Sequence, residues 1–152
     1  MTGDTATFTV DANQALLGAG SNFGIQSFGF NSSLDLSSAV FSLPNKWSVK
    51  SGQNLSMFGI FNYDTVGKGN SRHDPLTFTV TELGINNASQ FYIANSDGYH
   101  YAAHIADFTN GRDCDSAWFS DKATPPVPEP ATLMLLGSGL LGLAGFRRKM
   151  KK

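Results

Sequence analysis

Hydrophobic and polar residues alternate in short runs along most of the chain. The clearest run is LTFTVTEL (residues 76–83), in which Leu76, Phe78 and Val80 alternate with threonines. This period of two predicts a β-strand with one buried face and one exposed face. Further runs that are rich in aromatic and β-branched residues predict strands at residues 7–10, 23–30, 46–49, 57–63, 90–95 and 98–108.

Turn-forming residues separate these runs, most clearly at Pro44-Asn45 and in the stretch from Asn95 to Gly98. Short strands joined by loops rich in Gly, Asn, Ser and Asp predict a mainly β, antiparallel β-sandwich-like domain over residues 1–120. The stretch SSLDLSSAVFSL (residues 32–43) is compatible with a helix, and equally with a loop followed by a strand.

The amino-acid composition changes near residue 121. Four of the six prolines fall in SDKATPPVPEP, at residues 120–130. Proline removes a backbone donor and fixes φ, so we expect an extended, semi-rigid linker over residues 121–130.

A long uncharged run follows the linker, from Ala131 to Phe146. A helix of this length spans roughly 24 Å, short of the roughly 30 Å hydrocarbon core, and flanking Arg and Lys side chains can extend its reach. A buried core helix is the alternative, but only Thr132 and Ser138 are polar here. We therefore predict one transmembrane helix and its basic tail at residues 131–152. The apolar residues expected in the bilayer are Ala131, Leu133, Leu135, Leu136, Leu140, Leu141, Leu143 and Phe146.

Charge is distributed unevenly along the chain. The net charge is -1, but five of the 11 basic residues stand at the C-terminus, which leaves an acidic body that argues against a nucleic-acid partner. Basic residues beside a membrane span stay on the cytoplasmic side, so the β-rich domain is expected outside. The basic residues that set this topology are Arg147, Arg148, Lys149, Lys151 and Lys152.

Three features of the stretch VPEPATLMLLGSGLLGLAGFRRKMKK resemble a PEP-CTERM sorting signal. They are Pro128-Glu129-Pro130, then the apolar Gly- and Leu-rich span, then the basic cluster that begins at Arg147-Arg148. The resemblance implies an exported protein of a Gram-negative bacterium that makes exopolysaccharide. It also implies that an exosortase, a cysteine-dependent transpeptidase-like membrane enzyme, recognises the motif and removes the hydrophobic tail. The mature protein would pass from the inner membrane to the cell surface or extracellular matrix.

In this interpretation the chain is a substrate and not an enzyme. The nucleophile belongs to the exosortase, so the single cysteine, Cys114, needs no catalytic role. The flanking Asp113 and Asp115 also disfavour its thiolate. Export requires a signal peptide, and MTGDTATFTV at the start lacks the expected basic and apolar regions, so we expect the natural start to lie upstream.

Two polar groupings raise the question of a metal site. His100 and His104, with Asp107 nearby, alternate like strand residues, and positions four apart on a strand are roughly 13 Å apart, too far to share one ion. The stretch NYDTVGKGNSRHD (residues 62–74) offers Asp64, Asn70 and Asp74, but without the spacing of an EF-hand. We favour strand histidines and a plain hairpin loop, and expect no metal or cofactor.

Aromatic residues leave one further alternative open. Trp47, Tyr99, Tyr101 and Trp118 could form a sugar-stacking surface, although aromatic residues in a β-sandwich more often belong to the core. A carbohydrate-binding module with the same tail is therefore an alternative function. An uncleaved single-span membrane protein is another.

Overall fold

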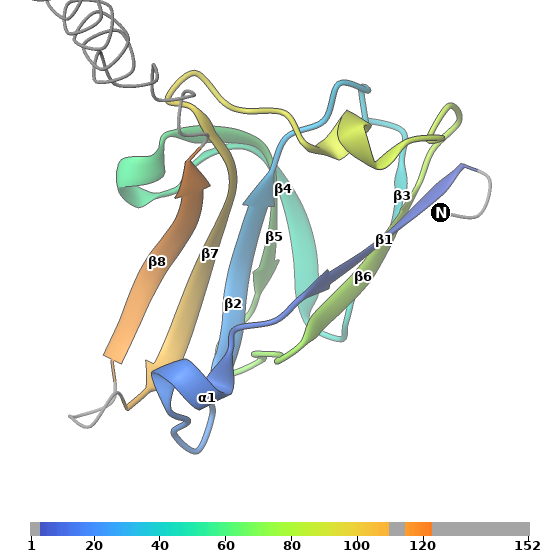
Figure 1. The fold of residues 1–152 in the computed structure, drawn as a ribbon. Coiled ribbons are helices and arrows are strands. Elements are labelled where there is room, and N and C mark those ends of the chain that lie inside the picture. Colours follow the sequence, from blue (N-terminus) through green and yellow to red (C-terminus); the bar gives the residue numbers. More distant parts are fainter. Residues whose placement is uncertain (1–3, 110–114, 123–152) are drawn as a thin grey trace, which may run out of the picture.

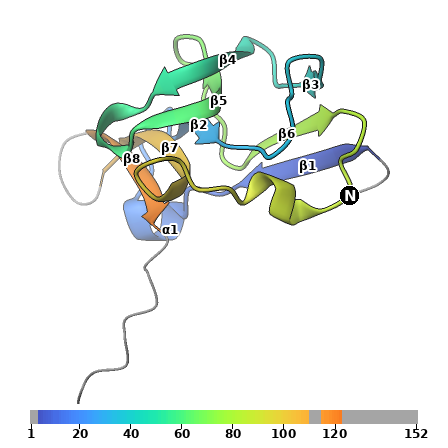
Figure 2. The same ribbon diagram turned by 90° about the horizontal axis from the view of Figure 1, so that it is seen from above.

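The computed structural model describes residues 4–109 and 115–122, which form two antiparallel sheets (Figure 1). The order is β1-β6-β3 in the three-stranded sheet and β4-β5-β2-β7-β8 in the five-stranded sheet. Figure 2 shows the two sheets as separate layers. The strands are β1 Thr5–Val10, β2 Gly24–Phe30, β3 Val40–Ser42, β4 Trp47–Asn54, β5 Ile60–Gly67, β6 Leu76–Thr81, β7 Tyr99–Phe108 and β8 Asp115–Lys122. The expected mainly antiparallel β class is confirmed.

Alternation along β6 places its apolar side chains between the sheets. Leu76, Phe78 and Val80 are buried, whereas Thr77 and Thr81 are exposed. The central position of β6, between β1 and β3, provides a partner for both of its edges. The strand predicted from this pattern is therefore the centre of the smaller sheet.

Phenylalanine rings fill the space between the two layers. Phe8 stacks on Phe78, its partner across β1 and β6, with ring centroids 4.6 Å apart and planes 3° apart. Phe91 meets Phe8 edge-on at 5.2 Å, and Phe28 and Phe30 of β2 approach from the other sheet. Full burial of such a side chain contributes about 1.5–3 kcal/mol. These rings form the aromatic part of the core between the sheets.

A second, smaller cluster packs on the other face of the five-stranded sheet. It contains Leu55, Phe61 and Ala102, with Phe58, Tyr99 and Trp118 packed against them. Gly29 lies opposite Ala102 in the sheet, and a Cβ at Gly29 would clash with the Leu55 Cδ1 methyl. The glycine therefore makes room for Leu55, which brings the short 3₁₀ helix η1 (Ser56–Phe58) close to this face.

The predicted strand at residues 90–95 is wrong. A 3₁₀ helix, η2 (Ala88–Phe91), occupies part of this segment. The Asn87 side chain accepts a hydrogen bond from the Ser89 N–H at 2.9 Å, and the Gln90 side chain accepts one from the Asn87 N–H at 2.9 Å. This reciprocal capping box favours a helical turn over an extended chain.

Several predicted elements differ in their limits. Met57 and Phe58 belong to η1, and Gly59, at φ 81°, turns the chain into β5. The strand predicted at 46–49 starts one residue later and continues to Asn54. Residues 32–43 adopt the second of the two open alternatives, a loop followed by β3. A short helix, α1 (Gln14–Leu17), and strand β8 were not predicted.

Within residues 4–109 and 115–122, no helix has the length and apolar character needed to cross a membrane. The predicted transmembrane helix at 131–152 lies outside the described residues. So does most of the predicted linker, whose first two positions, 121 and 122, belong to β8.

Candidate functional site

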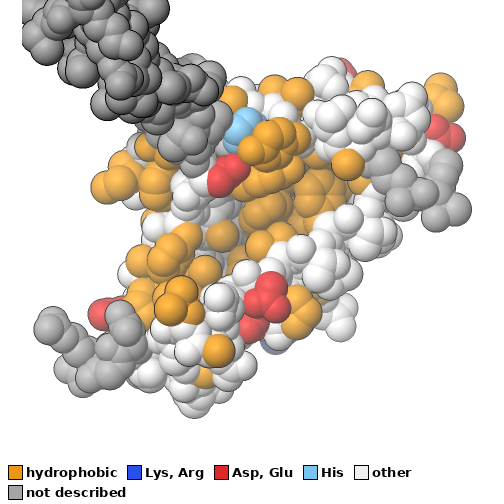
Figure 3. Space-filling model, viewed as in Figure 1, with side chains coloured by type: hydrophobic (Ala, Val, Ile, Leu, Met, Phe, Trp, Pro, Cys, Tyr) orange, Lys and Arg blue, Asp and Glu red, His pale blue; other side chains and the backbone are white. Residues whose placement is uncertain are grey.

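A groove opens between β1 and the β7–β8 half of the larger sheet. A cavity of about 520 Å³ is lined by Ala6–Val10 of β1 together with Phe28, Phe91 and Tyr101. An adjoining cavity of about 300 Å³ shares Val10, Phe28 and Tyr101 with it and continues along β8 to Asp121. We call the two cavities together the open groove. Figure 3 shows apolar side chains gathered in this hollow, with acidic side chains at both ends.

Unequal sheet sizes create the open groove. Among the described residues, β1 pairs only with β6, so its other edge faces the hollow. Five consecutive residues of β1 line the cavity. Because successive side chains of a strand point to opposite faces, a consecutive run can line one cavity only along the strand edge. The groove therefore presents backbone N–H and C=O groups as well as aromatic rings.

The polar groups around the groove are acidic or neutral. Asp11 and Asp121 belong to the lining, which contains no lysine or arginine within the described part of the chain. Burial raises the pKa of the Tyr101 hydroxyl above its ordinary value, and the nearby Asp121 and Tyr92 raise it further. Tyr101 therefore stays neutral at physiological pH and acts as a hydrogen-bonding, mainly apolar wall.

A hydrogen-bonded cluster fixes one end of the groove. The Asp121 Oδ1 atom accepts hydrogen bonds from the backbone N–H groups of Tyr101 at 2.9 Å and His100 at 3.2 Å. The other carboxylate oxygen lies 3.1 Å from the Nδ1 atom of His100. These contacts fall where the β7–β8 register shifts, between Tyr99 and Ala102. The carboxylate thus replaces backbone pairing at the shift and holds the end of β8 in place.

Tyr92 covers this cluster. Its ring stacks on that of His100, with centroids 3.8 Å apart and planes 9° apart, while the residue as a whole is 55% exposed. The sequence prediction missed Tyr92 as a surface residue because it placed this segment in a strand. The NxxQ pattern of Asn87 and Gln90 was the signal that could have revealed the helical turn.

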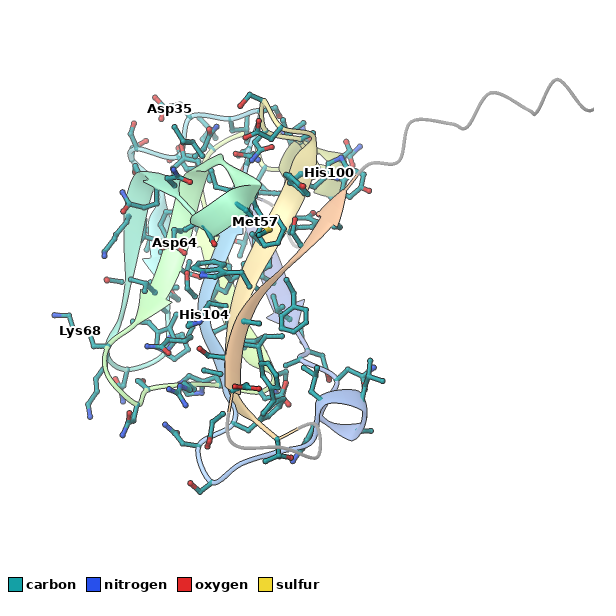
Figure 4. All side chains as sticks on the ribbon, turned by 90° about the vertical axis from the view of Figure 1, so that its left-hand side faces the viewer. Asp35, Met57, Asp64, Lys68, His100 and His104 are labelled. Carbon is teal, nitrogen blue, oxygen red and sulfur yellow. The ribbon has the colours of Figure 1, made fainter. Side chains whose placement is uncertain are left out.

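Ser27, Asp64 and His104 lie on three neighbouring strands of the outer sheet face. The Ser27 hydroxyl donates to the Asp64 carboxylate at 2.5 Å, and His104 lies opposite Ser27 in the register. Figure 4 shows Asp64 and His104 on the same side of the sheet. Among the described residues no hydrogen bond joins Ser27 to His104. The hydroxyl-to-imidazole contact that activates a serine nucleophile is therefore not formed.

Burial shifts the pKa values of Asp64 and His104 in opposite directions. Burial raises the pKa of the Asp64 carboxyl, and this outweighs the lowering by the Ser27 hydrogen bond and by Lys50. Burial lowers the pKa of His104, and the positive charge of Arg72 lowers it further. The His104 ring also stacks on Trp118 at a centroid distance of 5.0 Å.

The two candidate metal sites are not assembled in the structure. No group of three or more His, Cys, Asp or Glu is placed to hold a metal ion in the described part of the chain. His100 and His104 contact different partners, Asp121 and Trp118 respectively. Asp64 is buried in β5, whereas the Asp74 carboxylate accepts a hydrogen bond from the Ala12 N–H at 2.9 Å. The Asp64 and Asp74 carboxylates therefore serve separate structural contacts.

The four aromatic residues considered for sugar stacking are divided between the two apolar clusters. Trp47 and Tyr101 pack in the main core between the sheets. Tyr99 and Trp118 pack in the second cluster on the other sheet face. They do not form one continuous surface.

The predicted sorting residues lie outside the described residues. This holds for the motif Pro128, Glu129 and Pro130, for the apolar residues 131–146, and for the basic residues 147–152. It also holds for Cys114.

Comparison with known families finds a match in the C-terminal part of the chain. Residues 126–149 match the PEP-CTERM protein-sorting motif, as the three-part resemblance indicated. The matched segment begins four residues after Lys122, the end of the last described strand. Comparison with curated proteins and with solved structures gives no match to the chain. The motif implies recognition by an exosortase and export towards the cell envelope or surface.

Proposed function

We propose that the chain is a non-catalytic surface or matrix protein, whose β-rich domain is delivered outside the cell through processing of its tail by an exosortase. The observation that carries this proposal is the sorting-motif match at residues 126–149. The β-rich domain is the part that reaches the surface, and the exosortase carries out the removal of the tail.

The residues of the tail suit its insertion into the membrane, its orientation there and the exposure of the motif to the enzyme. The apolar span at 131–146 enters the inner membrane, and the basic residues at 147–152 remain on the cytoplasmic side because their transfer across the bilayer is costly. The motif then lies just outside the bilayer. Pro128 and Pro130 disfavour a helix there, so the segment is available as an extended peptide, with Glu129 as its charged recognition group.

The distance between domain and motif is short. Pro128 follows Lys122, the last residue of β8, by six positions. Even when fully extended, this stretch spans at most roughly 20–22 Å. The folded domain must therefore sit close to the enzyme during processing.

The experiment is to express the chain, fused to an upstream export signal, in a host with and without its exosortase. The proposal predicts a full-length membrane-bound form in the host without the enzyme, and a shortened, released form in the host with it. Membrane retention at full length in both hosts would favour an uncleaved single-span membrane protein.

Binding to exopolysaccharide is the second candidate role, for the delivered domain. The exposed Tyr92 ring favours it, because stacking on His100 holds that ring in one orientation beside the Asp121 carboxylate. A fixed aromatic face next to a hydrogen-bond acceptor is suited to a sugar ring. Tyr92→Ala should then abolish retention on immobilised exopolysaccharide, whereas Met57→Ala, a change at another exposed apolar residue, should not.

A further inference from the structure

The open groove combines two features that suit an extended polypeptide. Its wall is the free edge of β1, and its apolar surface includes Phe8, Phe28, Phe91 and Tyr101. Exposed edge strands are usually blocked by lysine, proline or a bulge, yet Thr5–Val10 contains no charged residue and no proline. Addition of a strand to such an edge supplies backbone hydrogen bonds, while apolar pockets receive alternate side chains.

We infer that the open groove is the docking site for this chain's own apolar C-terminal segment, residues 131–149, before that segment enters a membrane. The inference does not require the proposed processing. It identifies an interaction surface on the domain and assigns the sorting segment a second partner besides the bilayer.

The chain is long enough for this contact, and it leaves the domain in the right place. Asp121 lines the groove, and the next residue, Lys122, ends β8. Residues 123–130 can span up to roughly 26–29 Å. The six residues of β1 extend over about 20 Å. Because the chain leaves the domain at the groove itself, residue 131 can enter the groove in the same molecule, where tethering gives an effective concentration of roughly millimolar.

The chemistry of the segment also matches that of the groove. Residues 131–146 carry no charge, and Arg147, Arg148 and Lys149 follow. The groove is apolar and its charged lining residues, among those described, are Asp11 and Asp121. Apolar burial and the attraction between the basic end of the segment and these acidic residues thus favour the same pairing.

This pairing would keep a membrane-seeking segment out of water. An uncharged segment of 16 residues left exposed in an aqueous compartment would drive association between molecules. Docking in the groove covers both the segment and the free edge of β1. The bilayer then competes with the groove for the segment, and membrane entry exposes the groove outside the cell.

Cysteine cross-linking of the full chain in detergent-free buffer tests the inference. With Cys114→Ser as background, Gly139→Cys is combined either with Thr7→Cys on the free edge of β1 or with Ser51→Cys on β4. Both sites are exposed, and β4 is the far edge strand of the other sheet. A short bismaleimide is added at low protein concentration, and products are identified by intact mass and peptide mapping.

The expected result is an intramolecular link in most molecules of the Thr7→Cys chain and in few of the Ser51→Cys chain. Equal linking of both chains, or no linking of either, would overturn the inference. Links formed only between molecules would also overturn it, and would indicate that a second copy supplies the segment. Circular dichroism of both chains establishes that the domain is folded in each.

Discussion

Tyr99 and Lys122 are partners across β7 and β8, so the last described strand ends where β7 begins. The sorting-motif match starts at residue 126. Only residues 123–125 therefore separate the folded sheet from the matched segment. The domain and its sorting signal form a closely spaced pair, and their spacing can be varied experimentally.

Deleting residues 123–125 should prevent most of the processing by the exosortase. The deletion joins the motif directly to β8, whose backbone is paired with β7 and cannot enter an enzyme as an extended peptide. The measurement is the ratio of released to membrane-bound chain by immunoblot. Inserting three Gly or Ser residues at the same place should leave the ratio unchanged, and a reduction by the insertion as large as that by the deletion would contradict this explanation.

Replacing Pro128 or Pro130 with Ala, or Glu129 with Gln, should cause accumulation of the unprocessed membrane-bound form. Under the sorting proposal, Pro128 and Pro130 disfavour a helix and Glu129 supplies the charge for recognition. Pro125→Ala is the matched control, because this proline lies outside the matched residues 126–149. The proposal predicts normal processing of the control. Equal defects in the control and in Pro128→Ala would show that processing depends on the stiffness of the linker and not on the motif.

Phe78→Ala should lower the free energy of unfolding by about 3–5 kcal/mol. The Phe78 side chain is 2% exposed and stacks on Phe8 at the contact between the sheets. Leu83→Ala, at a residue that is 82% exposed, should change it by no more than about 0.5 kcal/mol. Urea unfolding followed by tryptophan fluorescence measures both variants, and similar losses in the two would be inconsistent with the packing described.

The alternating residues of β6 were sufficient to predict that strand, because one face of it is buried in full. The outer-face contacts could not be predicted in the same way. Ser27 and Asp64 are far apart in sequence, and their hydrogen bond depends on the pairing of β2 with β5. The open groove was likewise unpredictable, since it arises from the different numbers of strands in the two sheets.

Asp64→Asn should make the domain relatively more stable as the pH rises. Burial raises the pKa of Asp64 above 3.8, so the folded chain holds the proton more tightly than the unfolded chain. The resulting stabilisation is present below pH 3.8 and is lost as the pH rises through the raised pKa. Asn keeps an oxygen acceptor for Ser27 but cannot ionise. Compared with the unmodified chain, the variant should therefore gain unfolding free energy between pH 3 and pH 7.

Urea midpoints at the two pH values measure this effect, and a difference between variant and unmodified chain that is the same at both would refute it. Ser27→Ala serves as the comparison. It leaves the buried carboxylate without its hydroxyl donor and should cost about 1–3 kcal/mol. Because Ala cannot replace that donor, the loss should be larger at pH 7, where the carboxylate is charged, than at pH 3.

The most direct test of the sorting proposal is mass spectrometry of the C-terminus of the surface-exposed protein from a host with an active exosortase. The account predicts a mature chain that ends at or near Pro128-Glu129-Pro130 and contains no peptide from residues 147–152. Recovery of the intact C-terminal sequence FRRKMKK on the surface-exposed form would contradict it.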